Sequence, residues 1–78
     1  MRKVIDKKVY NTERDEHLGF KYVGIFGHLN GYEEQLFVTK SGQHYIFGAG
    51  GPESPYAEPQ IKLLTREEAD LWEHEYHL

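Results

Sequence analysis

Alternating hydrophobic and polar residues over short stretches of this chain predict β-strands. The clearest pattern consists of two β-prone runs, residues 34–40 and 43–47, which flank the pair Ser41-Gly42. A Ser-Gly pair between two such runs is typical of a hairpin turn. Because both faces of each run carry large side chains, we expect this hairpin to lie at the centre of a sheet and to be covered in part on its second face.

Shorter runs near the two ends of the chain predict further strands. Residues 4–5 and 9–10 are rich in β-branched and aromatic side chains and flank Asp6-Lys7, which predicts a second, tight hairpin. The apolar residues between 20 and 23 alternate with Lys21, so they predict another strand. Residues 61–64 predict a strand at the edge of the sheet.

Capping residues predict a short helix near the N-terminus. Asn11-Thr12 supplies side chains that can accept hydrogen bonds from free backbone amides, and it precedes the polar residues 13–18. We expect one or two helical turns there, closed by Gly19, because glycine is favoured just after a helix end.

A second helix is predicted at the C-terminus. Thr65 and Glu68 have the spacing of a capping box, so this helix should begin near residue 66 and run toward the end of the chain. Ala69, Trp72 and Tyr76 then form its apolar stripe, and Trp72 should anchor the helix on the sheet.

Glycine and proline predict loops over residues 24–31 and 48–59. The second segment contains three prolines, which cannot donate backbone hydrogen bonds, so regular structure is not expected there. A loop of about a dozen residues is usually kept for function or for covering a core. The sequence leaves open whether residues 48–59 bind a partner or only cover the core.

These elements define a small α+β fold. We expect a single domain over residues 1–78, with an antiparallel sheet of four to six short strands and one C-terminal helix packed on a face. The chain has no cysteine, no apolar stretch long enough for a bilayer and no signal-peptide pattern. A cytoplasmic protein without membrane contact is therefore expected.

The net charge of the chain indicates which class of partner it is expected to bind. Thirteen acidic side chains against nine basic ones give a net charge of −4 at pH 7. Nucleic-acid binders gain most of their affinity from basic groups, so direct nucleic-acid binding is not expected. A protein partner with a basic surface suits this charge better.

Two kinds of side chain are candidates for partner binding. Acidic residues cluster over residues 13–16 and on the C-terminal helix, and together with Glu33 and Glu34 they would form an anionic surface. A solvated helix face is the simpler interpretation of each cluster taken alone. We also expect four aromatic side chains to be exposed, since they exceed what one small core needs and tyrosine is common at binding hot spots. The candidates are Tyr32, Glu33, Glu34, Tyr45, Phe47, Tyr56, Glu67, Glu68 and Glu73.

Asp70, His74 and His77 form a candidate metal site. Their i, i+4 and i+7 spacing places a carboxylate and two imidazoles on one helical face, and these ligands suit a structural Zn²⁺. A closed site needs a fourth ligand, for which His17, His28, His44 or a glutamate is available. The alternative is that histidines in the last turn simply favour the helix dipole.

Catalytic patterns are sparse in this sequence. It lacks cysteine, and neither Ser41 nor Ser54 sits in a Gly-x-Ser-x-Gly elbow. We therefore expect a non-enzymatic protein. Two alternatives remain: a zinc-stabilised module associated with nucleic acid, and a small histidine-dependent ribonuclease using His44 with Lys40 or Tyr45.

Four segments in order carry a further pattern. They are Lys8-Val9-Tyr10-Asn11-Thr12, Leu36-Phe37-Val38-Thr39-Lys40-Ser41-Gly42, Gly48-Ala49-Gly50-Gly51-Pro52-Glu53-Ser54-Pro55-Tyr56-Ala57 and Leu64-Thr65-Arg66-Glu67-Glu68-Ala69-Asp70-Leu71-Trp72. Together they resemble small uncharacterised proteins of bacterial phages and conjugative mobile elements, although Asp6-Lys7 stands where that family often has Asn-Gly. The resemblance implies an accessory protein of a mobile element and assigns no functional residue. Compact acidic proteins of such elements are often inhibitors of host defence nucleases, anti-CRISPR proteins among them, so the expected function is inhibition by protein binding.

Overall fold

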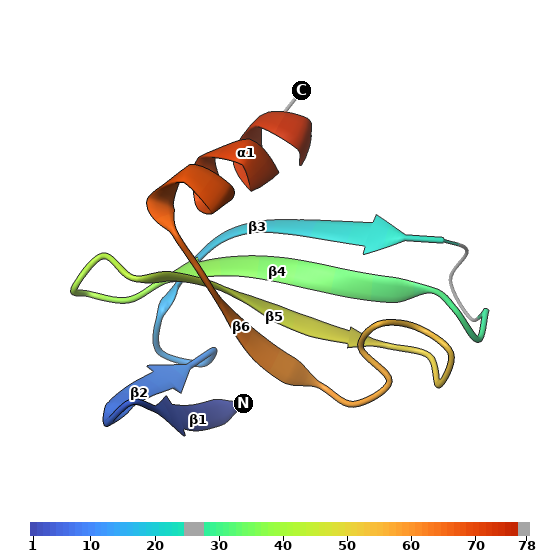
Figure 1. Cartoon of the computed structure of the whole chain (residues 1–78), viewed down its shortest axis with the longest axis horizontal. Coiled ribbons are helices and arrows are strands. Elements are labelled where there is room, and N and C mark those ends of the chain that lie inside the picture. The colour runs from blue at the N-terminus through green and yellow to red at the C-terminus, as the bar shows by residue number, and fades with distance from the viewer. Residues whose placement is uncertain (25–27, 77–78) are drawn as a thin grey trace.

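The computed structural model describes residues 1–24 and 28–76 and shows an α+β fold, as the sequence predicts (Figure 1). Within these residues there are two antiparallel sheets, one of two strands (β1-β2) and one of four in the order β3-β4-β5-β6. A helix follows the last strand. The elements are β1 (Arg2–Ile5), β2 (Lys8–Asn11), β3 (Glu16–Val23), β4 (Tyr32–Val38), β5 (His44–Gly50), β6 (Gln60–Leu64) and α1 (Arg66–Tyr76).

The β4-β5 hairpin lies at the centre of the larger sheet, which confirms the prediction. Leu36 pairs with Ile46, and Phe37 pairs with Tyr45. The turn closes with a hydrogen bond from the Gly42 amide to the Thr39 carbonyl oxygen (3.0 Å). Gly42 has φ of 91°, a left-handed conformation that glycine adopts without steric cost.

The β1-β2 hairpin is also confirmed, and within the described residues its two strands form a separate two-stranded sheet. Asp6 and Lys7 both have positive φ, 50° and 66°, as the tight turn between two right-twisted strands requires. The ends of the hairpin are joined by the amide of Thr12, which donates to the Met1 carbonyl oxygen (2.9 Å).

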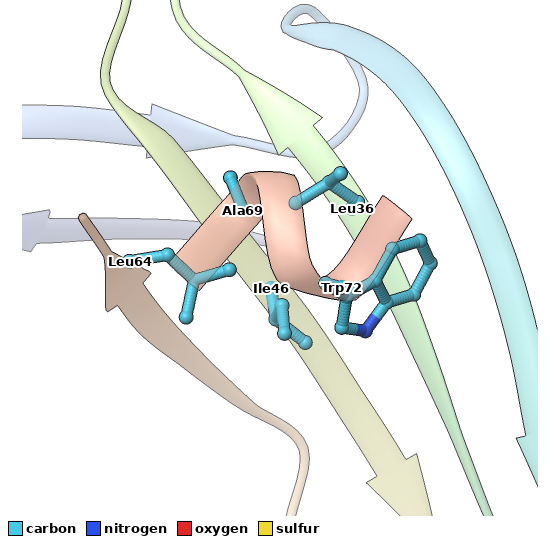
Figure 2. Packing of buried hydrophobic residues seen from close by; sticks show 5 residues of the cluster. All are labelled: Leu36, Ile46, Leu64, Ala69 and Trp72. Atoms are coloured by element: carbon cyan, nitrogen blue, oxygen red, sulfur yellow. The ribbon is translucent and has the colours of Figure 1, made fainter. Parts of the chain in front are cut away.

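One face of the four-stranded sheet is covered by α1 (Figure 2). The buried cluster between them consists of Leu36, Ile46, Leu64, Ala69 and Trp72. The first two of these side chains lie opposite each other on β4 and β5, so the helix crosses the centre of the sheet.

The other face of the sheet is covered in part by the β1-β2 hairpin. Tyr10 packs there against Phe37, Tyr45 and Ile61. The Tyr10 and Tyr45 rings meet edge to face, with their centroids 5.3 Å apart, while the Phe37 and Tyr45 rings stack 5.4 Å apart. Because side chains alternate across a strand, this second cluster shares the central strands with the first.

The capping box before α1 is confirmed. The Glu68 amide donates to Thr65 Oγ1 (3.1 Å), and the Thr65 amide donates to Glu68 Oε1 (2.9 Å). These reciprocal bonds satisfy two backbone amides that a helix start leaves free. Of the predicted apolar stripe, Ala69 and Trp72 are buried, and the Tyr76 side chain lies outside the described part of the structure.

The predicted helix over residues 13–18 is wrong. Only one turn forms, in which the amides of Arg14 and Asp15 both donate to the Asn11 carbonyl oxygen (3.1 and 2.9 Å). From Glu16 the chain continues as β3, which pairs with β4 from Glu16 to Val23. A ladder of this length satisfies many more backbone groups than two isolated helical turns, which are marginal in water.

The predicted loop over residues 48–59 begins later than expected. Gly48, Ala49 and Gly50 belong to β5, and the segment after them folds back over the sheet. Its Tyr56 ring lies directly against Gly48, where any Cβ would overlap the ring. Glycine is therefore required within this strand by close packing, and the loop covers part of the core.

The loop predicted over residues 24–31 is present where the structure describes it, with a turn at residues 28–31, while residues 25–27 lie outside the described residues.

In the described part of the chain, α1 is too short and too polar to cross a membrane.

Candidate protein interface

The outward face of α1 carries an exposed leucine. Leu71 is 64% exposed, whereas its neighbours Ala69 and Trp72 point into the core. A large apolar side chain at such exposure contributes little to folding, because the hydrophobic gain scales with the apolar area removed from water. It is a candidate contact for another molecule.

Acidic side chains surround Leu71 on this helix. Residues three and four positions away are the neighbours of any helical residue, and at Leu71 they are Glu67, Glu68, His74 and Glu75. All four are exposed. The arrangement is an apolar centre with a polar, mostly anionic rim, which is the usual composition of a protein interface. We call Leu71 and these four residues the α1 patch.

Hollows lie on both sides of Leu71. One is a shallow, open groove along the surface of α1, lined by Glu67, Asp70, Leu71 and His74. The other, of about 270 Å³, lies between α1 and the sheet, and Lys62, Leu64 and Glu75 are among its lining residues. A partner side chain therefore has room on each side of the leucine.

The charge of α1 is strongly negative. Five acidic side chains stand against the single Arg66 along the helix. Hydrogen bonds from the backbone and the hydroxyl of Thr65 hold the pKa of Glu68 below its ordinary value, so this carboxylate is ionised at neutral pH. The rim of the α1 patch is anionic under physiological conditions.

A second carboxylate, Glu34, holds α1 in place from below. Its Oε1 accepts hydrogen bonds from the Trp72 indole (3.1 Å) and from Lys21 Nζ (2.9 Å), and its Oε2 accepts one from the Tyr56 hydroxyl. Burial by itself raises the pKa of Glu34, but these donors together hold it below its ordinary value. One carboxylate thus joins β3, the loop after β5 and α1.

Glu34 is therefore not available to a partner as the sequence predicted. Only 12% of its side chain is exposed, and its oxygens are used within the protein. Lys62 of β6 also lies near the α1 patch, since it adds to the lowering of the pKa of Glu68 and lines the hollow between α1 and the sheet together with Glu34. The anionic rim consists of helix residues alone.

The prediction that Tyr45 and Tyr56 are exposed is wrong. Tyr45 has 0% exposure, and its hydroxyl donates to Asp15 Oδ2 (2.7 Å). Burial and the neighbouring carboxylates, Asp15 for Tyr45 and Glu34 for Tyr56, raise the pKa values of both phenols. The sequence could not reveal this, because each hydroxyl is satisfied by an acid distant along the chain.

The remaining candidates near the central strands are half-buried. The Tyr32 ring is tilted against Tyr56, with centroids 5.5 Å apart. Phe47 packs at the edge of the second cluster, and Glu33 accepts a hydrogen bond from Gln35 Nε2 (3.0 Å). On α1, Glu67 and Glu68 are exposed and Glu73 is half-buried. Glu67 and Glu68 are thus the accessible acidic candidates.

The candidate zinc ligands lie at the end of the same helix. Asp70 and His74 are exposed and border the open groove beside Leu71, and His77 lies outside the described residues. Over residues 1–24 and 28–76, no group of three or more His, Cys, Asp or Glu side chains is arranged to hold a metal ion.

The structure separates His44 and Tyr45, one of the two residue pairs predicted for a histidine-dependent ribonuclease. His44 and Tyr45 are consecutive residues of β5, so their side chains point to opposite faces of the sheet. Tyr45 is also enclosed in the second cluster. These two residues are therefore not positioned to act on one substrate.

Comparison with known proteins adds no identification: no family model matches the chain, and neither the curated proteins nor the solved structures contain a significant match. The resemblance to phage and mobile-element proteins stays a prediction.

Leu71 is the residue that sequence reasoning missed. The stripe of Ala69 and Trp72 defines the buried side of α1, and Leu71 is turned about 100° away from Trp72 around a helix of 3.6 residues per turn. Its four helical neighbours are all polar or charged. A search for an apolar residue surrounded only by polar neighbours would have found it.

Proposed function

We propose that this protein is a non-enzymatic binding module whose α1 patch docks onto a basic surface of a protein partner. The observation that carries the proposal is the exposure of Leu71 at the centre of an acidic rim. Burying a leucine side chain contributes roughly 1.5–3 kcal/mol, and the carboxylates around it supply steering and orientation.

The rigidity of the patch supports this function. The capping bonds between Thr65 and Glu68 fix the first turn of α1, and the hydrogen bond from Trp72 to Glu34 fixes the inner side of the helix. A surface held in one conformation loses little conformational entropy when it binds. The patch is thus preorganised for a partner.

The resemblance to mobile-element proteins supplies the biological setting of the proposal. In that setting the protein acts in the cytoplasm of a bacterial host, and its partner is a host protein. Defence nucleases bind nucleic acid through basic grooves, and an anionic surface such as the α1 patch would occupy such a groove. Inhibition of a nuclease is the activity we propose.

The test compares two exposed leucines. Immobilised wild-type protein, Leu71→Ala and Leu29→Ala are incubated with host lysate, and the retained proteins are identified by mass spectrometry. Leu29 is a matched control, because it is 58% exposed, belongs to the segment between β3 and β4 and lines a different hollow from those that border Leu71. We expect a protein that wild type and Leu29→Ala retain and that Leu71→Ala binds about tenfold more weakly.

Charge is tested separately on the partner identified in this way. Glu67→Gln/Glu75→Gln should weaken binding and reduce its dependence on salt, whereas Glu53→Gln/Glu58→Gln, with the same net charge, should not. Equal retention by Leu71→Ala and wild type would refute the role of the α1 patch. Cleavage of nucleic acid by the pure protein would refute the non-enzymatic assignment.

A further inference from the structure

A second surface has the opposite character to the α1 patch. A hollow of about 400 Å³ lies where the β1-β2 hairpin meets the β4-β5 turn, and it is lined by Val9, Arg14, Asp15, Thr39, Lys40 and Ser41. We call it the basic hollow. Its volume has room for on the order of ten water molecules, and so for an aliphatic side chain.

The lining of the basic hollow carries two basic side chains, Arg14 and Lys40, against one acidic side chain, Asp15, and Glu16 lines the adjoining hollow. Over the residues that the structure describes, the ion pair within 4 Å is Lys21 with Glu34, so Arg14 and Lys40 have no such partner there. Asp15 is held in place by bonds that its Oδ2 accepts from the Asn11 amide (3.0 Å) and the Tyr45 hydroxyl (2.7 Å), and its carboxylate offsets one of the two basic charges.

The neighbouring hairpin extends this positive surface. Residues 2–11 carry four exposed basic side chains and one acidic side chain, and Val4 stands 53% exposed among them. The basic β1-β2 hairpin and the acidic α1 therefore form two separate surfaces, and each has an exposed apolar side chain, Val4 and Leu71 respectively.

We infer that the α1 patch of one molecule docks into the basic hollow of a second copy of this chain. Leu71 enters the hollow against Val9, and Glu67 and Glu75 face Arg14 and Lys40. The inference goes beyond the proposed function, because it names the chain itself as an occupant of the α1 patch and assigns a role to the basic hollow.

The two surfaces cannot meet within one molecule. The helix and the hairpin pack on opposite faces of the four-stranded sheet, with α1 above it and β1-β2 below it in Figure 1. A contact between two different surfaces leaves a free α1 patch on one copy and a free hollow on the other, so the association is head to tail and open-ended. A protein partner that binds α1 competes with it.

The association is expected to be weak. The net charge of −4 makes whole molecules repel one another, but at physiological ionic strength this repulsion is screened beyond about 8 Å. Contacts between close opposite charges are screened less, so short-range complementarity decides the outcome.

The experiment is sedimentation velocity on the pure protein from about 10 μM to about 1 mM, a span that covers weak affinities. We expect the sedimentation coefficient to rise with concentration and to fall back in high salt. Glu67→Lys/Glu75→Lys and Arg14→Glu/Lys40→Glu should each associate about tenfold more weakly or not at all. Glu53→Lys/Glu58→Lys has the same net charge as the helix variant and should still associate.

Mixing gives the decisive result. The helix variant keeps a native basic hollow and the hollow variant keeps a native α1 patch, so an equimolar mixture should associate although neither does so alone. A monomeric wild type, or a mixture that remains monomeric, would overturn the inference. These outcomes are independent of the proposed function, because Arg14→Glu/Lys40→Glu leaves the α1 patch intact for capture of a host partner.

Discussion

Replacing Glu34 by glutamine removes one negative charge while keeping the shape of the side chain. In the wild type the carboxylate accepts bonds from Lys21, Tyr56 and Trp72. A glutamine keeps one oxygen acceptor and places an amide donor where the other oxygen was, so one donor of the protein loses its acceptor. Lys21, whose side chain is only 13% exposed, loses its counter-charge.

The cost follows from these contacts. Hydrogen bonds to a charged group contribute about 1.5–3 kcal/mol and neutral ones about 0.5–1.5, so changing three of them costs on the order of 2–4 kcal/mol. The total free energy of unfolding of a domain of this length is roughly 4–12 kcal/mol. We therefore expect Glu34→Gln to lower the melting temperature by about 10 °C or more, since 1 kcal/mol corresponds to about 4–8 °C here.

The assay is urea denaturation followed by far-UV circular dichroism and by the fluorescence of Trp72, which is the sole tryptophan. Glu33→Gln is the matched control, because Glu33 is the preceding residue of β4 and bonds only to Gln35 among the contacts described above. It should cost about 0.5 kcal/mol. The double variant Glu34→Gln/Lys21→Met should be more stable than the sum of the two single effects predicts, because it removes both members of the ion pair together.

The pH dependence provides an independent check. The pKa of Glu34 is lower in the folded than in the unfolded protein, so its contribution is present at neutral pH and is lost as the pH falls below the ordinary glutamate value of about 4.3. The stability gap between wild type and Glu34→Gln should therefore narrow in acid. Equal stability of Glu34→Gln and Glu33→Gln at pH 7, or a gap independent of pH, would refute the reasoning.

Three further predictions concern buried side chains. Trp72→Ala should cost about 3–5 kcal/mol in urea denaturation, because it removes the aromatic anchor between α1 and the sheet, and a midpoint that hardly moves would contradict this. Gly48→Ala should cost about 1–3 kcal/mol because its Cβ overlaps the Tyr56 ring, and the cost should shrink in a Tyr56→Ala background. Burial and the neighbouring Asp15 raise the pKa of the Tyr45 hydroxyl in the folded protein. Its contribution to the free energy of unfolding is therefore fully present below the pKa of an unfolded tyrosine, about 10, and is lost as the pH rises above that value. A Tyr45→Phe variant should show a smaller fall above that pH in thermal denaturation; an identical alkaline profile would argue against this role.

Features encoded by neighbouring residues could be predicted from the sequence. Both hairpins and the start of α1 depend on residues next to each other, such as Ser41-Gly42, Asp6-Lys7 and the pair Thr65 and Glu68. The physical signal is local, since each of these turns and caps is satisfied within a few residues.

Features decided by distant contacts could not be predicted. The polar run before Gly19 becomes a strand because β4, more than a dozen residues later, offers it a partner. Gly48 was predicted to lie in a loop, because the reason for a glycine within this strand is its contact with the Tyr56 ring, which comes from a later segment. Tyr45 was predicted to be exposed for the same reason: its hydroxyl donates to Asp15, which lies 30 positions away in the sequence.

The isolated pairing of β1 with β2 has a consequence for the dynamics of the protein. Among the residues that the structure describes, no backbone hydrogen bond of the ladder joins this hairpin to the larger sheet, and a two-stranded hairpin alone is marginal in water. Its attachment depends on aromatic contacts such as that between Tyr10 and Tyr45. Amide protons of β1 and β2 should therefore exchange with deuterium by local opening, well before those of β4 and β5.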